Sequence, residues 1–251
     1  MREVVVTGGG TGIGYATAAA FASLGDRVTI TGRREQVLRE AAERLGAAHV
    51  PFDAASPAAV HEALDSLPAR VDVLVNNAGG NTDLDRGRSA ELMDAELMDV
   101  AEAWLANLNA NLMSAVLVTT ALAPRMGEGG RIVTIGSIAA RGTGSGSYGA
   151  AKAAVESWTA DLAADLGPRG ITANVVSPGL ILDTEFFRGR LTEEGVRARV
   201  QNTRNGRPGT PPTWPTPSCS WPPREPGTSR GRCSMSTAAP TWAAELWEEG
   251  R

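Results

Sequence analysis

Residues 3–24 read EVVVTGGGTGIGYATAAAFASL, and this stretch decides the fold. A Val-rich run ends at Thr7, a glycine-rich turn follows, and an Ala-rich helical pattern begins at Gly12. Glycines permit a tight bend and a close backbone approach, while a helix N-terminus presents free N–H groups to an anion. The stretch predicts a strand-turn-helix unit that binds the pyrophosphate of a dinucleotide, and a simple turn is the alternative interpretation.

The same alternation of short Val/Ile-rich runs and longer helical patterns continues to about Thr210. It predicts further strands at 27–31, 48–51, 71–76, 131–135 and 172–177, with helices between them. Repeated strand-helix-strand units with almost continuously apolar strands are typical of a parallel sheet covered on both faces. The predicted fold class is therefore α/β, a Rossmann-type doubly wound parallel sheet formed by one domain, residues 1–210. Ligands are expected at the carboxyl ends of its strands.

The tail, residues 211–251, differs in composition from the rest of the chain. It holds eight of the fifteen prolines and four of the six tryptophans, and no helical or strand period continues into it. Written back into GC-rich codons and read one base out of frame, 213–222 can encode DVADAVLFLA and 227–242 can encode HVTGQVLHVNGG. Our hypothesis is a frameshift near Pro211 or Pro212 that removes a C-terminal helix and strand; a disordered tail is the alternative. A native intact mass that matches the printed C-terminus would rule the frameshift out.

Composition argues against several classes of partner. The net charge is -4, without a basic stripe, so neither nucleic acid nor a membrane surface is expected as a partner. We expect no charged and apolar leader before the first strand. We also expect no later run of about 18 apolar residues that could span a bilayer. Together these expectations favour a cytoplasmic location. Both cysteines, Cys219 and Cys233, lie in the tail, and His49 and His61 stand alone. No metal site is predicted.

Lys152 is the only lysine among 24 basic residues, which invites a chemical explanation. It follows Tyr148 by four residues in a predicted helix that runs to about Leu166, so the two side chains share one face. A free phenol has a pKa of about 10 and needs a nearby cation to favour its anion at neutral pH. Lys152 supplies one, and Ser137 follows a strand in a Gly/Ser-rich stretch that can approach the tyrosine. Each residue alone is also a common turn or core residue.

The second strand ends in Thr31-Gly32-Arg33-Arg34, without the acidic residue that accepts hydrogen bonds from an unmodified ribose 2′-hydroxyl. Arginine suits a 2′-phosphate, so the sequence favours NADP over NAD, with Arg33 as the better candidate. The alternative is that both arginines begin a solvated helix. The fourth strand ends in Asn76-Asn77-Ala78-Gly79, which is either a cofactor motif or an Asn/Gly turn.

These motifs together resemble the short-chain dehydrogenase/reductase family, particularly its 3-oxoacyl-carrier-protein reductase-like branch, over residues 3–210. The resemblance implies an NAD(P)-dependent oxidoreductase that moves a hydride between nicotinamide and a carbonyl or secondary alcohol, here an NADPH-dependent ketoreductase. The implied catalytic residues are Asn111, Ser137, Tyr148 and Lys152, with Asn107 and Asn109 as nearby decoys. The implied cofactor-binding residues are Gly8, Gly12, Ile13, Gly14, Arg33, Asp53, Asn77, Ala78, Gly79, Tyr148, Lys152, Pro178, Gly179 and Thr184.

The resemblance also implies roles and partners. Asn111 is expected to hold a water that links Lys152 to solvent, and residues 185–207 are expected to form a mobile substrate lid. The partners are a small carbonyl or alcohol substrate and further copies of the chain, in a homodimer or homotetramer formed through the helices at 94–126 and 148–166. Two alternatives stay open: a catalytically silent NADP-binding regulator, and a product made nonfunctional by a shifted C-terminus that leaves a sheet edge exposed.

Overall fold

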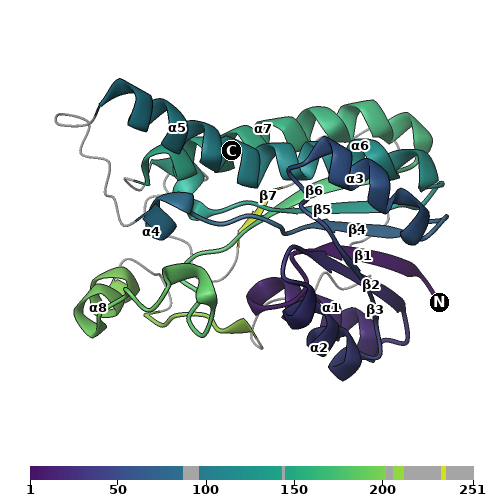
Figure 1. Cartoon of the computed structure of the whole chain (residues 1–251), viewed down its shortest axis with the longest axis horizontal. Coiled ribbons are helices and arrows are strands. Elements are labelled where there is room, and N and C mark those ends of the chain that lie inside the picture. Colours follow the sequence, from purple (N-terminus) through teal and green to yellow (C-terminus); the bar gives the residue numbers. More distant parts are fainter. Residues whose placement is uncertain (87–95, 143–144, 202–205, 212–232, 236–251) are drawn as a thin grey trace, which may run out of the picture.

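The computed structural model describes residues 1–86, 96–142, 145–201, 206–211 and 233–235 (Figure 1). Within these residues, seven parallel strands form one sheet in the order β3-β2-β1-β4-β5-β6-β7. The strands are β1 (Glu3–Thr7), β2 (Arg27–Gly32), β3 (Ala48–Pro51), β4 (Val73–Asn76), β5 (Arg131–Ile135), β6 (Thr172–Ser177) and β7 (Cys233–Met235).

Helices cover both faces of the sheet, as expected for a doubly wound fold (Figure 1). The described helices are α1 (Gly12–Ser23), α2 (Glu35–Leu45), α3 (Pro57–Ala63), α4 (Thr82–Arg86), α5 (Leu97–Leu108), α6 (Ser114–Leu122), α7 (Gly146–Leu166) and α8 (Glu193–Gln201). Helices α1 and α2 lie on one side, and α3, α5, α6 and α7 lie on the other.

Strand β1 shows why the sequence folds this way. Val4 and Val6 pack with Phe21 of α1 on one face, whereas Val5 packs with Leu122 of α6 on the other. All three valines are fully buried, since successive side chains of a strand point to opposite faces. A continuous apolar run is therefore what a strand covered on both sides requires, and the predicted Rossmann-type fold is confirmed.

The strand order reverses between β1 and β4. From β1 the chain continues outward to β2 and β3, then returns to pair β4 with the other edge of β1, in the register Val4 to Val73. Connections leave the carboxyl ends of β1 and β4 in opposite directions, which opens a crevice there. A ligand is expected in this crevice, at the carboxyl ends of the strands.

One long helical segment differs from expectation. Leu97–Arg125, which contains α5, a π-helical turn at Asn109–Met113 and α6, is long and apolar enough to cross a membrane. The expectation that no such stretch exists is therefore wrong. Length and composition are weak support for a span, because the core helix of a globular domain passes the same test. In this segment Asn111 and Thr119 are buried and hydrogen-bonded to Gly80 and Asn76 of the domain.

A short strand also remains at the C-terminal edge. Cys233–Met235 pairs in parallel with β6, in the register Val175 to Cys233. This corrects the expectation that the tail contributes no strand, and the physical reason is that ladder hydrogen bonds join backbone groups whatever the side chains are. The frameshift hypothesis also expects that a helix has been lost from the tail. That expectation concerns residues 212–232, which lie outside the described residues.

Candidate functional site

A cavity of about 980 Å³ opens at the carboxyl ends of the strands, with a lining that comes from the turns after β1 to β6. This volume is typical of a site for a cofactor or a drug-sized ligand. Of the predicted site residues, those that line it are Gly8, Gly12, Ile13, Arg33, Asp53, Asn77, Ala78, Gly79, Ser137, Tyr148, Lys152, Pro178, Gly179 and Thr184. Gly14 and Asn111 are not among the residues that line it.

The glycine-rich turn packs too tightly for side chains. A Cβ at Gly14 would lie 2.2 Å from the Gly8 carbonyl oxygen, and Gly8 itself has a positive φ of 64°. The Asn77 side chain holds the turn, since its Nδ2 donates to the carbonyl oxygens of Thr7 and Gly8 at 3.0 Å each. The sequence motifs that follow β1 and β4 are thus parts of one structure, in which Asn77 fixes the glycine turn.

The N-terminus of α1 faces the cavity and suits a pyrophosphate. Its N-cap residue, Thr11, makes no side-chain cap, and Gly12 and Ile13 of the first turn line the cavity. Uncapped N–H groups and the positive end of the helix dipole attract an anion. The residues present therefore fit a dinucleotide, whose phosphates would meet this helix end.

The two arginines after β2 have different surroundings. The Arg34 guanidinium pairs with the Glu185 carboxylate through Nη2–Oε2 at 2.6 Å and Nη1–Oε1 at 3.2 Å. This arginine holds the pKa of the Glu185 carboxyl below its usual value. Arg33 lines the same cavity, and among the described residues it has no acidic partner. Arg33 is thus the arginine that is available to a ligand.

Asp53 follows β3 and lines the same cavity. Its Oδ1 accepts a hydrogen bond from the backbone N–H of Ala55 at 2.9 Å, which orders the turn after β3. The carboxylate is therefore fixed in the cavity wall, where the sequence analysis expects the adenine ring.

Ser137 and Tyr148 come together as predicted. The Ser137 side chain lies close enough to the Tyr148 hydroxyl to lower its pKa by hydrogen bonding, and Tyr148 is 6% exposed. Burial raises the pKa of Tyr148 to about 12, and the bond to Ser137 only partly offsets this rise. The expectation was a pKa lowered by Lys152; in the structure desolvation of the anion outweighs any such effect.

Lys152 is buried on the same helix face, with its Nζ 5.9 Å from the centre of the Tyr148 ring. Its ammonium donates to the Ile135 carbonyl oxygen at 2.8 Å rather than to the tyrosine. Burial lowers the pKa of Lys152 to about 8, and the charge of Glu156 acts in the opposite direction. A lysine held in this way keeps its charge at neutral pH.

Asn111 lies apart from these three side chains. Its Nδ2 donates to the carbonyl oxygens of Gly80 and Asn107 at 2.9 Å each, and its Oδ1 accepts from the Gly80 N–H at 3.1 Å. It sits in the π-helical turn, a feature that is frequent at functional sites. The structure thus ties Asn111 to the segment after β4, and its role in holding a water stays a prediction.

A buried polar chain beside Asn111 was not predicted from the sequence. Asn107 is fully buried, and its Nδ2 donates to Ser147 Oγ at 2.8 Å. Ser147 Oγ in turn donates to Asp83 Oδ2 at 3.1 Å, and the Thr82 N–H donates to Asn107 Oδ1 at 3.1 Å. Asn107 therefore has a structural role, because it joins α4, α5 and the start of α7 next to Tyr148. The signal that the sequence offers is an asparagine four residues before Asn111, on the same helix face.

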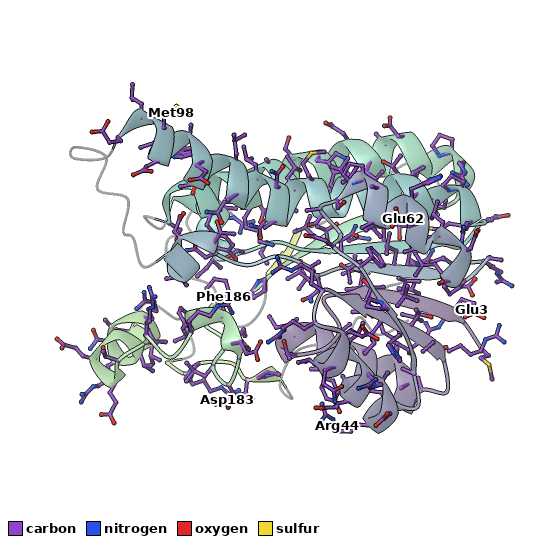
Figure 2. All side chains as sticks on the ribbon, viewed as in Figure 1. Glu3, Arg44, Glu62, Met98, Asp183 and Phe186 are labelled. Carbon is purple, nitrogen blue, oxygen red and sulfur yellow. The ribbon has the colours of Figure 1, made fainter. Side chains whose placement is uncertain are left out.

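The expected lid forms a separate lobe beside the carboxyl end of the sheet (Figure 1). It leaves and rejoins the domain at one place, where Ile181 bridges Gly209 and the Leu182 N–H donates to the Gly209 carbonyl oxygen at 2.9 Å. Figure 2 shows Phe186 between this lobe and the sheet. The Phe186 ring lies 5.6 Å from the Tyr148 ring, centre to centre, so the lobe supplies an apolar wall of the site.

Comparison with known proteins agrees with this architecture. The family model described as short chain dehydrogenase matches residues 2–195. An NADP-dependent 3-hydroxy acid dehydrogenase of Escherichia coli is 34% identical over 211 residues, which are 80% of this chain and 82% of that protein. Sulfoacetaldehyde reductase 2 of Chromohalobacter salexigens is 36% identical over 195 residues, 73% of each chain.

A solved structure is similar over most of the domain. The short chain dehydrogenase of Burkholderia cenocepacia in complex with NADP superposes with a TM-score of 0.69 and 36% identity, and the match covers 84% of this chain and 86% of that one.

Proposed function

The chain belongs to the short-chain dehydrogenase family and is an NAD(P)-dependent oxidoreductase, and from that premise we propose that it is an NADPH-dependent ketoreductase. The observation that carries the proposal is that Ser137, Tyr148 and Lys152 line the same cavity as Arg33, with Ser137 following β5 and Arg33 following β2. When bound, the nicotinamide supplies or accepts the hydride.

The side chains of the site have complementary roles in this proposal. Tyr148 gives the proton to the carbonyl oxygen, and its raised pKa, about 12, keeps that proton in place at neutral pH, as reduction requires. Ser137 donates a hydrogen bond to the same oxygen, where negative charge develops. The buried ammonium of Lys152 stabilises the tyrosinate that remains. Phe186 excludes water from the tyrosine.

The proposal of NADP rather than NAD rests on Arg33. The E. coli relative is named for NADP and the Burkholderia structure contains it, which supports the same choice. The substrate is a small carbonyl compound. The similarity to the 3-oxoacyl-carrier-protein reductase-like branch stays a prediction, since the relatives described above carry other names.

We expect Arg33→Asp to raise the Kd for NADPH by about 10- to 100-fold, because charged hydrogen bonds to a phosphate are lost. The Kd for NADH should stay the same or fall, since an acidic side chain accepts hydrogen bonds from the 2′-hydroxyl. Fluorescence titration with both cofactors measures this. Arg39→Asp is the matched control, because it makes the same charge change on the exposed side of α2, away from the cavity. Equal weakening by both variants contradicts the assignment of Arg33.

We also propose a homodimer or homotetramer, with α5 in the interface. Its large apolar side chains Leu97, Met98 and Leu105 are 84%, 80% and 59% exposed, and Figure 2 shows Met98 at the outer end of the helix. Such a patch marks a protein contact. Light scattering should give a multiple of the chain mass, and Leu105→Asp should reduce it; a wild-type monomer overturns the proposal.

A further inference from the structure

Glu156 lies one turn after Lys152 on α7 and joins two segments that flank the site. The Ser177 hydroxyl, at the end of β6, donates to Glu156 Oε1 at 2.5 Å. Arg141, in the 3₁₀ turn Ile138–Arg141 that follows Ser137, pairs with Glu156 Oε2 at 3.4 Å. Ser177 is fully buried, and the side chains of Glu156 and Arg141 are only 21% and 22% exposed, so water screens these contacts poorly.

The carboxylate also fits closely under the backbone that leads to Ser137. A Cβ at Gly136 would lie 2.7 Å from Ser177 Oγ and 3.1 Å from Glu156 Oε1. The ends of β5 and β6 are held together at this point, where the Gly136 N–H donates to the Val176 carbonyl oxygen at 2.9 Å. Pro178, which lines the cavity, follows Ser177 directly. The Glu156 contacts therefore fix the position of Ser137 relative to the segment that follows β6.

The charge of Glu156 acts on Lys152. Burial lowers the pKa of Lys152, and among the described residues Glu156 is the charged group that raises it. Arg141 reaches Glu156 itself. The other elements that contact α7 carry these charged side chains: Asp83 of α4, which accepts from Ser147 Oγ, Asp99 and Glu102 of α5, Arg131 at the opposite end of β5, and Arg169 beyond the C-terminus of α7. Strand β6 and the π-helical turn carry no titratable side chain. Glu156 is thus the carboxylate that offsets the burial of the lysine.

We propose that Glu156 is a positioning residue for this site: its carboxylate anchors the end of β6 and the turn after Ser137, and stabilises the ammonium form of Lys152. The proposal rests on the ketoreductase function for its kinetic consequences, whereas its electrostatic consequence is measurable without turnover.

Lys152 gives a direct readout because it is the only lysine in the chain. Protein labelled with ¹³C-lysine should show one lysine side-chain NMR signal, whose pH titration reports the pKa of Lys152. We expect Glu156→Gln, which removes the charge but keeps the shape, to lower the titration midpoint by on the order of one pH unit. Asp161→Asn makes the same charge change at an exposed position of α7 and should leave the midpoint unchanged. An unchanged midpoint in folded Glu156→Gln protein overturns the electrostatic role.

The kinetic test separates anchoring from charge. Lys152 loses its proton as pH rises through its pKa, so the alkaline fall in kcat should move to lower pH in Glu156→Gln. Ser177→Ala keeps the charge and removes only the anchoring hydroxyl. It should leave the midpoint and the alkaline limb in place and lower kcat about fivefold, without raising the Kd for NADPH.

Wild-type kcat in Ser177→Ala overturns the anchoring role, and this variant carries the test if Glu156→Gln does not fold. If the wild-type protein reduces no carbonyl but the lysine midpoint shifts as expected, the ketoreductase function fails and the electrostatic role of Glu156 stands.

Discussion

Tyr148→Phe is expected to lower kcat for carbonyl reduction by about 10²- to 10⁴-fold, the range that general acid catalysis contributes. Phenylalanine keeps the ring that packs against Phe186 and removes the hydroxyl that we propose as the proton donor to the carbonyl oxygen. The Kd for NADPH should change little, since the glycine turn and Arg33 are untouched. Rapid-mixing measurements of NADPH oxidation with saturating substrate give kcat directly.

Tyr15→Phe provides the control, because Tyr15 is the only other tyrosine and lies in α1 with Arg44 over its ring, away from the cavity. It should retain wild-type kcat. If Tyr148→Phe retains more than about a tenth of wild-type kcat, another group or water delivers the proton, and the assignment of Tyr148 is wrong.

Ser137→Ala is expected to lower kcat by about 10²- to 10³-fold, as the loss of one hydrogen-bond donor to a developing oxyanion does. A second effect follows from the structure. The loss of the bond to Ser137 should raise the pKa of Tyr148 further, since that bond is what lowers it in the wild-type protein. A higher tyrosine pKa makes proton donation harder, so both effects act in the same direction.

Ser137 also has a structural role that the experiment must separate. Its Oγ accepts from the Ala139 N–H at 3.1 Å at the start of the 3₁₀ turn, so the variant should lose about 1 kcal/mol of stability. A thermal melt measures that loss. Ser157→Ala, at an exposed position of α7, is the control for the substitution itself. If kcat falls by less than about tenfold in folded Ser137→Ala protein, the oxyanion role of Ser137 is contradicted.

Local patterns in the sequence predicted most of the fold. The strand at 131–135 and the strand at 172–177 have the predicted bounds, because a continuous apolar run in a covered sheet leaves little freedom. Strand β4 begins at Val73 rather than at 71, because Val71 is buried but its N–H donates to the Arg125 carbonyl oxygen and not to a neighbouring strand.

The site was predictable where its residues are close in sequence. Tyr148 and Lys152 share a helix face by their spacing alone, and an acidic residue four positions after Lys152 was an available signal for Glu156. The pairing of Arg34 with Glu185 was not predictable, since it joins residues 151 positions apart. Nor was the burial of Asn107, because its partners Thr82 and Ser147 lie 25 and 40 positions away in the sequence.

The central claim is that this chain transfers a hydride, and isotope transfer tests it most directly. The full-length protein is incubated with NADPH deuterated at C4, on each face in turn, and with a panel of aldehydes, cyclic ketones and 3-oxo acids, followed by mass spectrometry of the products. We predict that one of the two deuterated forms of NADPH gives an alcohol with one deuterium on the carbinol carbon, and that Tyr148→Phe lowers the rate at which this product forms by about 10²- to 10⁴-fold. Tight NADPH binding without label in any product would contradict the claim and favour a silent NADP-binding regulator.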